Sequence, residues 1–313
     1  MVLPFAEASV ADVLAFCAWL SIALVHPAVM VLALLHPWTV RRLARQREDQ
    51  PPVSVLLPVS AADHDVAGCL DRVVRLSYPR FEVLVCSDSV DAPAFRLIKD
   101  HAQRIEGADL RFFVARERIG RNPKINNLVP ALAASNYETQ LIKDANVAFE
   151  VGDLARLVRY LGSGTGLVCS IPVGVNPRSL AADVEQSMMN GRDAPYTLAA
   201  SVLGMNLGYG KVMLFRKADL VQAGGLGILA DHFGDDHALS VAMGRLGLAT
   251  VYTDGFVAQP LENRSWRTVL DRQLRWLVIR RNQAFPAFFL EPFMTWPAAV
   301  ASAWLAAPLL GWT

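Results

Sequence analysis

The chain has 313 residues, 53% of them hydrophobic, and a formal net charge of +1 at neutral pH. This length allows one large domain or two smaller ones, and the near-zero charge argues against nucleic acid as a partner. The four cysteines form no closely spaced pair, so neither a zinc site nor a disulfide framework is indicated. That usage suits a reducing compartment.

The first predicted element is a membrane anchor. Residues 13–35 carry no acidic or basic side chain apart from His26, and about 20 apolar residues cross a bilayer as a helix. A secretory signal has a shorter apolar core and a basic start, whereas no Lys or Arg precedes Arg41. The alternative is a helix buried in the core of the protein.

The flanking charges predict the orientation of this anchor. Glu7 and Asp12 precede it, and four arginines follow it: Arg41, Arg42, Arg45 and Arg47. Because positive charge stays on the cytoplasmic side, residues 1–40 are expected to form the anchor with the N-terminus outside. Residues 41–262 are expected to form a domain in the cytosol.

Short apolar runs alternate with helical periods in this middle region. Strands are expected at 53–59, 82–88, 110–115, 139–146 and 166–173, and helices at 64–76, 93–104, 124–134 and 152–161. Such alternation predicts βαβ units, and therefore an α/β fold with a mostly parallel sheet and helices on both faces. Ligands of such sheets bind at the carboxyl ends of the strands.

Polar and acidic residues follow several of these strand ends. They are Asp88 and Asp91 after the second strand, Asp144 and Asn146 at the fourth, and Asp235 and Asp236 at the start of a later helix. Carboxylates from separate elements can converge on one cleft and hold a hard divalent cation that bridges substrate phosphates. The alternative for each aspartate alone is a helix cap or a turn.

The stretch "RIGRNPKINNLVPAL" at 118–132 combines basic residues with little bulk. Pro123 fits the first turn of a helix, whose free N–H groups and positive dipole end can bind an anion. Pro130 is expected to kink or shorten that helix. The residues that would hold the loop or contact a ligand are Lys124, Asn126 and Asn127. The alternative is a plain helix cap with a solvated basic flank.

A basic helix is predicted within residues 263–292. Arg272 and Arg275 are three residues apart and are expected to share a face, with Trp276 beside them. Arginine can hold phosphate oxygens through paired donors, and tryptophan can stack on a sugar or an apolar acceptor. The alternative is an amphipathic helix on the membrane surface, and both roles can coexist.

A second apolar segment, residues 293–312, ends the chain without a charged side chain. It predicts a C-terminal membrane helix at 293–313, entered from the cytosolic side. Because no polar flank follows, a truncated version of a longer protein is expected.

Together these motifs resemble the processive and lipid-linked glycosyltransferases of family 2. The closer resemblance is to the ceramide glucosyltransferase branch, which includes bacterial hopanoid-associated lipid glycosyltransferases. "IGRNPKINNLVP" is similar to that branch's G-x-N-P-K-x-N-N-L segment, with support from "YPRFEVLVC", "GLVCSIPVG", "FRKADLVQAGGL" and "RQLRW". The resemblance spans about residues 50–292.

The resemblance implies a GT-A (Rossmann-like) fold, a nucleotide-sugar donor and an inverting displacement. Asp236 would be the catalytic base. Asp235 precedes it at a position where members of the family often carry a second acidic residue. The donor would be bound by Asp88 or Asp91, Lys124, Asn126, Asn127, Asp144, Arg272, Arg275 and Trp276. Mg²⁺ or Mn²⁺ would lie at Asp144 and Asn146, although an Asn at this position brings no charge.

The activity implied is transfer of a hexose from UDP-glucose to ceramide at the cytosolic leaflet, with the bilayer itself as a partner. An alternative is transfer of N-acetylglucosamine or another hexose to diacylglycerol or another lipid. A different class of function is also considered, that of a non-catalytic membrane protein that retains the fold. Asn146 is the only feature of the sequence that favours it. Residues 185–211, rich in Met and small side chains, would face the lipid acceptor or simply fill the core.

Overall fold

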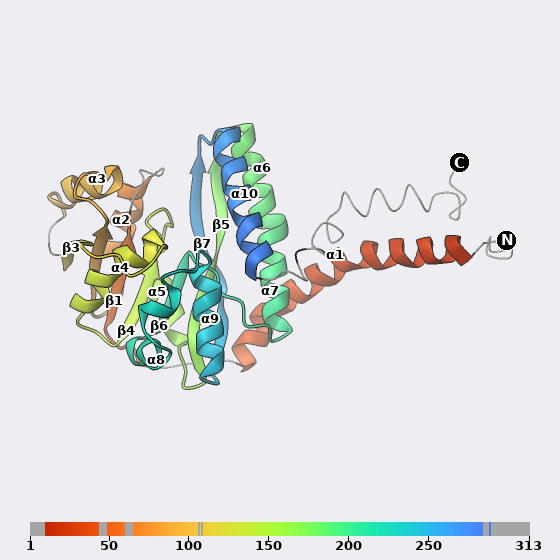
Figure 1. Cartoon of the computed structure of the whole chain (residues 1–313), viewed down its shortest axis with the longest axis horizontal. Helices are drawn as coiled ribbons and strands as arrows, with labels where there is room; N and C mark the ends of the chain where they lie inside the picture. The colour runs from red at the N-terminus through yellow and green to blue at the C-terminus, as the bar shows by residue number, and fades with distance from the viewer. Residues whose placement is uncertain are drawn as a thin grey trace.

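The computed structural model describes residues 10–43, 49–59, 65–105, 107, 109–283 and 288. Within these residues the body is a mixed α/β unit built on a seven-stranded sheet, and a long first helix extends away from it (Figure 1). The predicted membrane segment at 293–312 lies outside the described residues.

The sheet has the order β3-β2-β1-β4-β6-β5-β7. Its strands are β1 (Val53–Pro58), β2 (Phe81–Ser87), β3 (Leu110–Val114), β4 (Thr139–Lys143), β5 (Thr165–Pro177), β6 (Val212–Arg216) and β7 (Ala249–Glu262). All neighbours are parallel except β6, which is antiparallel to both β4 and β5. The prediction of a mostly parallel sheet is therefore confirmed.

The helices complete the alternation that the sequence predicts. They are α1 (Val10–Leu43), α2 (Val66–Val74), α3 (Pro93–Ala102), α4 (Pro123–Ala134), α5 (Asp153–Arg159), α6 (Leu180–Met188), α7 (Ala194–Val202), α8 (Lys217–Gln222), α9 (Asp235–Arg245) and α10 (Trp266–Gln283). A π-helical turn, Met189–Asp193, joins α6 to α7, and a 3-10 turn spans Leu226–Leu229. Helix α4 continues through Pro130 to Ala134, so the proline does not cut it short.

Helices cover both faces of the sheet because side chains alternate along its strands. Val55 and Leu57 of β1 pack on one face with α2, α3 and α5. Leu56 points to the other face and packs with α4, α7, α8 and α9. This alternation produces two apolar cores and leaves the strand ends open to carry polar side chains.

Helix α1 meets the body at its C-terminal end, where it packs against α7 and β7 (Figure 1). Arg41 there lies 2.6 Å from the carboxylate of Asp254. The span Trp19–Arg42 is long and apolar enough to cross a membrane, and 12% of its most apolar 18-residue stretch is buried. Exposed Leu24, Val31 and Leu34 argue against a helix buried in the core.

Candidate functional site

The candidate site lies where β4 ends and β6 begins. Because β6 is antiparallel, Lys143 at the end of β4 pairs with Val212 at the start of β6. Lys211 therefore stands beside Asp144, whose N–H donates to the Lys211 carbonyl at 3.0 Å. The sheet register thus brings a cation to the carboxyl end of the central parallel strands, where the sequence placed only acidic and amide groups.

Two lysine ammonium groups hold the Asp144 carboxylate. Lys211 Nζ lies 2.9 Å from Oδ2 and Lys124 Nζ lies 3.3 Å from Oδ1. Lys211 also donates to Asn146 Oδ1 at 3.2 Å. Burial alone would raise the pKa of Asp144, but the two ammonium groups outweigh it and lower the pKa to about 2. The carboxylate is therefore ionised at neutral pH.

Lys124 connects this strand end to the start of α9. Its Nζ lies 3.1 Å from Asp235 Oδ2 and donates to the Gly210 carbonyl at 2.8 Å. Burial disfavours the ammonium charge, but Asp144, Asp235 and Asp236 outweigh that effect and raise the pKa of Lys124. Lys124 is accordingly a fixed cation that contacts three segments of the chain.

The start of α4 positions Lys124. The Asn122 side chain accepts the Lys124 N–H at 3.0 Å, which caps the helix, and donates to the His232 carbonyl at 2.6 Å. A Cβ on Gly120 would lie 2.4 Å from the Ala230 carbonyl oxygen, so only glycine allows this approach. The loop before α4 is thereby fixed against residues 230–232.

Asn126 and Asn127 hold this loop. Asn126 Oδ1 accepts the N–H groups of Ile119 and Gly120 at 2.9 and 3.2 Å, and its Nδ2 donates back to the Gly120 carbonyl at 2.9 Å. Asn127 Nδ2 donates to the Val59 carbonyl at 3.4 Å. Both side chains are buried, so of the two roles considered for them the structure shows the loop-holding one.

Asp236 lies in the first turn of α9, where acidic side chains favour the helix dipole. Its Oδ1 accepts the His237 N–H at 2.8 Å. Burial and then repulsion from Asp235 raise the pKa of Asp236 to about 6. A carboxylate with this pKa can accept a proton near neutral pH, which is what a general base requires. The hydrogen bond from His237 and the raised pKa are therefore found together in one residue.

Two glycines allow the loop before β6 to press against Asp236. A Cβ on Gly208 would lie 2.0 Å from the Asp236 carbonyl oxygen, and a Cβ on Gly210 would lie 3.1 Å from its Oδ2. Lys211 follows directly. The same short loop therefore positions both the carboxylate of Asp236 and the ammonium group of Lys211.

The arginine motif of α10 is divided between two environments. Arg272 reaches the fully buried Glu185 of α6, with Nη1 2.9 Å from Oε1, and Arg264 approaches the other oxygen at 3.2 Å. Arg275 is exposed. Residues three apart diverge by about 60° around a helix, and the edge of α10 that faces α6 passes between these two. The two arginines therefore differ in burial and in partners, although they are neighbours on the helix surface.

Tyr209 links α10 to the strand-end site. Burial raises its pKa, helped by Asp193 and Asp236 and opposed by Arg272 and Arg280. Charged groups of both α9 and α10 therefore influence its hydroxyl group. Trp276 lies beside Arg272, with its ring centre 6.0 Å from Arg272 Cζ.

Asp88 and Asp91 follow the carboxyl end of β2 and so lie at the same edge of the sheet as Asp144. Both are exposed. Asp91 forms an ion pair with Arg96 in α3, whereas the contact seen for Asp88 among the described residues is a long hydrogen bond from Ser87 at 3.4 Å. Of the two candidate aspartates, Asp88 therefore has the carboxylate that is less engaged by neighbouring side chains.

The residues predicted to hold a metal do not fit a divalent cation as they are arranged. Both Asp144 oxygens face ammonium groups, and Asn146 Oδ1 accepts from Lys211. Within the described ranges, no group of three His, Cys, Asp or Glu side chains is placed to hold a metal ion.

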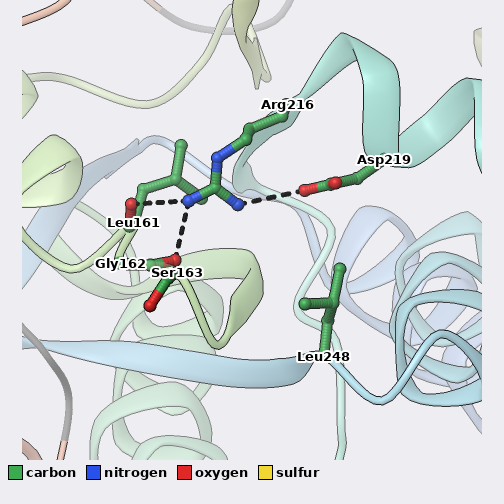
Figure 2. Close-up of a pocket in the computed structure, with 6 residues that line it drawn as sticks. All are labelled: Leu161, Gly162, Ser163, Arg216, Asp219 and Leu248. Atoms are coloured by element: carbon green, nitrogen blue, oxygen red, sulfur yellow. Dashed lines mark hydrogen bonds and ion pairs between the residues drawn. The ribbon is translucent and has the colours of Figure 1, made fainter.

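A pocket of about 440 Å³ lies at the opposite edge of the sheet, lined by Leu161, Gly162, Ser163, Arg216, Asp219 and Leu248 (Figure 2). Arg216 pairs with Thr139 at the start of β4, far along the strand from Asp144. Its guanidinium donates to Asp219 and to the Leu161 and Gly162 carbonyls (Figure 2). This arginine serves the loop structure, and the pocket is separate from the candidate site.

Two residues of these charged clusters, Lys211 and Glu185, were not found in the sequence analysis. Lys211 lies between a Gly-rich loop and a short apolar run, and that pattern was its only signal. Glu185 lies in the Met-rich stretch, where a single acidic residue in a helical run gives no sign of burial. The 185–211 segment is buried in part, since Met189 is buried whereas Leu203 and Met205 are exposed.

The chain is similar to curated ceramide glucosyltransferases at low identity. Ceramide glucosyltransferase 3 of Caenorhabditis elegans is 22% identical, covering 91% of this chain and 61% of that protein. Ceramide glucosyltransferase of Komagataella phaffii is 24% identical, covering 92% and 69%. The chain thus spans about three fifths to two thirds of the length of these relatives.

Solved structures share the fold. A mannosyltransferase from Pyrobaculum calidifontis, solved with GDP-Man and Mn²⁺, superposes with a TM-score of 0.58 at 19% identity, covering 94% of this chain and 90% of that one. GalNAc-T7, solved with UDP, GalNAc and Mn²⁺, superposes with a TM-score of 0.52 at 12% identity, covering 68% and 44%. These matches support the expected GT-A-like fold.

The sequence pattern of glycosyl transferase family 21 matches residues 20–313. This match and the ceramide glucosyltransferase relatives confirm the branch to which the sequence motifs pointed. The chain, with its parallel α/β sheet and charged cluster at the end of β4, therefore belongs to glycosyl transferase family 21.

Proposed function

We propose that the protein transfers a hexose from a nucleotide sugar, first of all UDP-glucose, to the hydroxyl group of a membrane lipid, first of all ceramide. The observation that carries this proposal is Asp236, whose pKa is raised to about 6 beside the Lys124–Asp144–Lys211 cluster. The ceramide glucosyltransferase relatives support the choice of donor and acceptor.

The reaction is a single displacement. The acceptor hydroxyl oxygen forms a bond to the anomeric carbon as the bond from that carbon to the β-phosphate oxygen breaks. The nucleoside diphosphate leaves with the electron pair, and the hydroxyl proton passes to Asp236. A positioned base of this kind contributes about 10²–10⁴-fold to the rate, and attack from the face opposite the leaving group inverts the anomeric configuration.

The remaining contacts to the donor are assigned from the position and existing partners of each side chain. We assign the nucleoside to Asp88 ahead of Asp91, because Asp91 is already paired with Arg96. Asn126 and Asn127 act indirectly by holding the loop that positions Lys124. Arg275 and Trp276 are the α10 residues left to contact phosphate or acceptor, since Arg272 is committed to Glu185.

The membrane surface in this proposal runs along α1, α6 and α10. Leu270, Leu274 and Leu277 repeat on one face of α10 and are exposed, as is Leu180 of α6. Helices α6 and α10 lie side by side, and α1 meets the neighbouring α7 (Figure 1). An apolar stripe on a helix with arginines suits the boundary between headgroups and acyl chains, where a lipid hydroxyl would be presented.

We expect the catalytic domain to face the cytosol, because the arginines after the anchor stay on that side. In intact cells, external protease should remove an epitope tag placed at the N-terminus and should leave the domain whole. Permeabilised cells provide the control in which the domain is also cleaved. A protected N-terminal tag would contradict this topology.

The rate should fall with decreasing pH through about 6, the raised pKa of Asp236. Below that pH the group is protonated and cannot accept the hydroxyl proton, whereas above it the carboxylate predominates and kcat/KM should level off. A pH profile in mixed micelles measures this. A profile that is flat through this range would remove Asp236 from the role of base.

Release of UDP separates an enzyme from a non-catalytic membrane protein. The detergent-solubilised protein should release UDP from UDP-glucose when ceramide is added, and should release none when either substrate is left out. A protein that retains only the fold should release none in any combination. Release from UDP-N-acetylglucosamine with diacylglycerol instead would favour the second activity considered above.

A further inference from the structure

We propose that Lys211 takes the place of a divalent cation at the donor diphosphate, with Lys124 bracing the same carboxylate, so that transfer proceeds without metal. The inference rests on the proposed function of this site. It begins from the position of Lys211, whose ammonium group contacts both residues that were predicted to be metal ligands, Asp144 at 2.9 Å and Asn146 at 3.2 Å.

The ligand set favours an ammonium group over a metal ion. Mg²⁺ and Mn²⁺ sites of this kind are held by carboxylates together with substrate phosphates, and Asn146 supplies an oxygen without charge. The second Asp144 oxygen faces Lys124 at 3.3 Å. A divalent cation would have to displace Lys211 and would then be repelled by Lys124, whereas the two lysines already supply the same total positive charge.

The two lysines have different roles. Lys124 directs its three N–H groups at Asp144, Asp235 and the Gly210 carbonyl. The described residues engage Lys211 Nζ through Asp144 and Asn146, which leaves its third N–H for a ligand oxygen. With side chains 17% and 25% exposed, Lys211 and Asp144 are within reach of a bound diphosphate. Lys211 is therefore the group that contacts the phosphate, and Lys124 is a positioning residue.

The chemistry needs a positive charge at this point. As the bond from the anomeric carbon to the phosphate oxygen breaks, the electron pair and the negative charge pass to the nucleoside diphosphate. A fixed cation beside that oxygen stabilises the transition state more than the ground state. Lysine binds phosphate as a point charge, and the loop at Gly208 and Gly210 fixes where Lys211 begins.

The first test compares metal-free and metal-loaded protein. The whole chain, stripped of metal, is assayed for UDP release from UDP-glucose and ceramide in EDTA, in Mg²⁺ and in Mn²⁺, and UDP binding is measured by calorimetry under the same conditions. The proposal predicts equal rates and equal UDP affinity in all three. A rate and a UDP affinity that both require metal would overturn the proposal and leave the proposed function standing.

The second test uses Lys211→Met, with Lys99→Met on the exposed side of α3 as the matched control. Lys211→Met should weaken UDP binding in EDTA by roughly 10- to 100-fold, as expected for one hydrogen bond to a charged group. Mn²⁺ should restore little of this affinity, because Lys124 still faces the other Asp144 oxygen at 3.3 Å. Lys99→Met should match the unchanged protein in every measurement.

The two proposals can fail separately. If no combination of substrates releases UDP, the proposed function fails, and the calorimetry still decides the role of Lys211. UDP binding in EDTA that Lys211→Met weakens would then support the inference. UDP binding that needs Mn²⁺ in the unchanged protein, or that Lys211→Met leaves intact, would overturn it.

Discussion

Replacing Asp236 by Asn should remove turnover while donor binding stays nearly unchanged. Asn keeps the size of the side chain and an oxygen that can accept the His237 N–H, but it cannot take the acceptor proton. Because a base acts in the transition state, kcat should fall by about 10²-fold or more with little change in UDP affinity. Initial rates of UDP release and calorimetric UDP binding measure the two quantities.

The control for this variant is Asp100→Asn, an exposed aspartate in α3. Asp235→Asn is not expected to be silent, because Asp235 contacts Lys124 at 3.1 Å. Asp235→Asn should instead loosen Lys124 and weaken donor binding. If Asp236→Asn keeps its rate while Asp235→Asn loses turnover with normal UDP affinity, the base is the neighbouring residue.

Glu185→Gln should be strongly destabilising. The substitution keeps the volume but removes the carboxylate that pairs with both Arg264 and Arg272, whose side chains are 3% and 11% exposed. Breaking a buried ion pair at one partner costs about 3–5 kcal/mol. The midpoint of thermal unfolding in detergent should fall accordingly.

Asp183→Asn provides the comparison, since Asp183 is exposed in the first turn of the same helix. Its loss should cost less than about 1 kcal/mol, the size of a charge interaction with a helix dipole. If Glu185→Gln unfolds at the same temperature as the unchanged protein, the Glu185 ion pairs are not structural. Arg272 would then become available as a direct donor contact.

Much of the fold could be predicted because the apolar runs are short and regularly spaced. Strands β1 to β5 and the helices between them lie within a few residues of their predicted bounds. The path of β6 could not be predicted, since a five-residue apolar strand carries no sign of its direction. Its antiparallel pairing with β4 depends on tertiary contacts.

In the site, too, residues in local motifs could be predicted, whereas residues that depend on tertiary contacts could not. Lys124, Asp144 and Asp236 were found because each lies in a motif of the sequence, and the structure places them together. Lys211 belongs to the site only because β6 runs backwards beside β4. The Glu185 pairing with Arg272 likewise joins two helices far apart in the sequence, so no local pattern could reveal that this arginine is committed to the protein interior.

Mass spectrometry of lipids tests the central proposal most directly. The purified protein is incubated with UDP-glucose or UDP-N-acetylglucosamine, each with ceramide or diacylglycerol, and Asp236→Asn serves as the inactive control. The account predicts that UDP-glucose adds the mass of one hexose to ceramide, and that the variant adds none. A folded protein that leaves every lipid unchanged, or that adds the hexose equally well without Asp236, would contradict it.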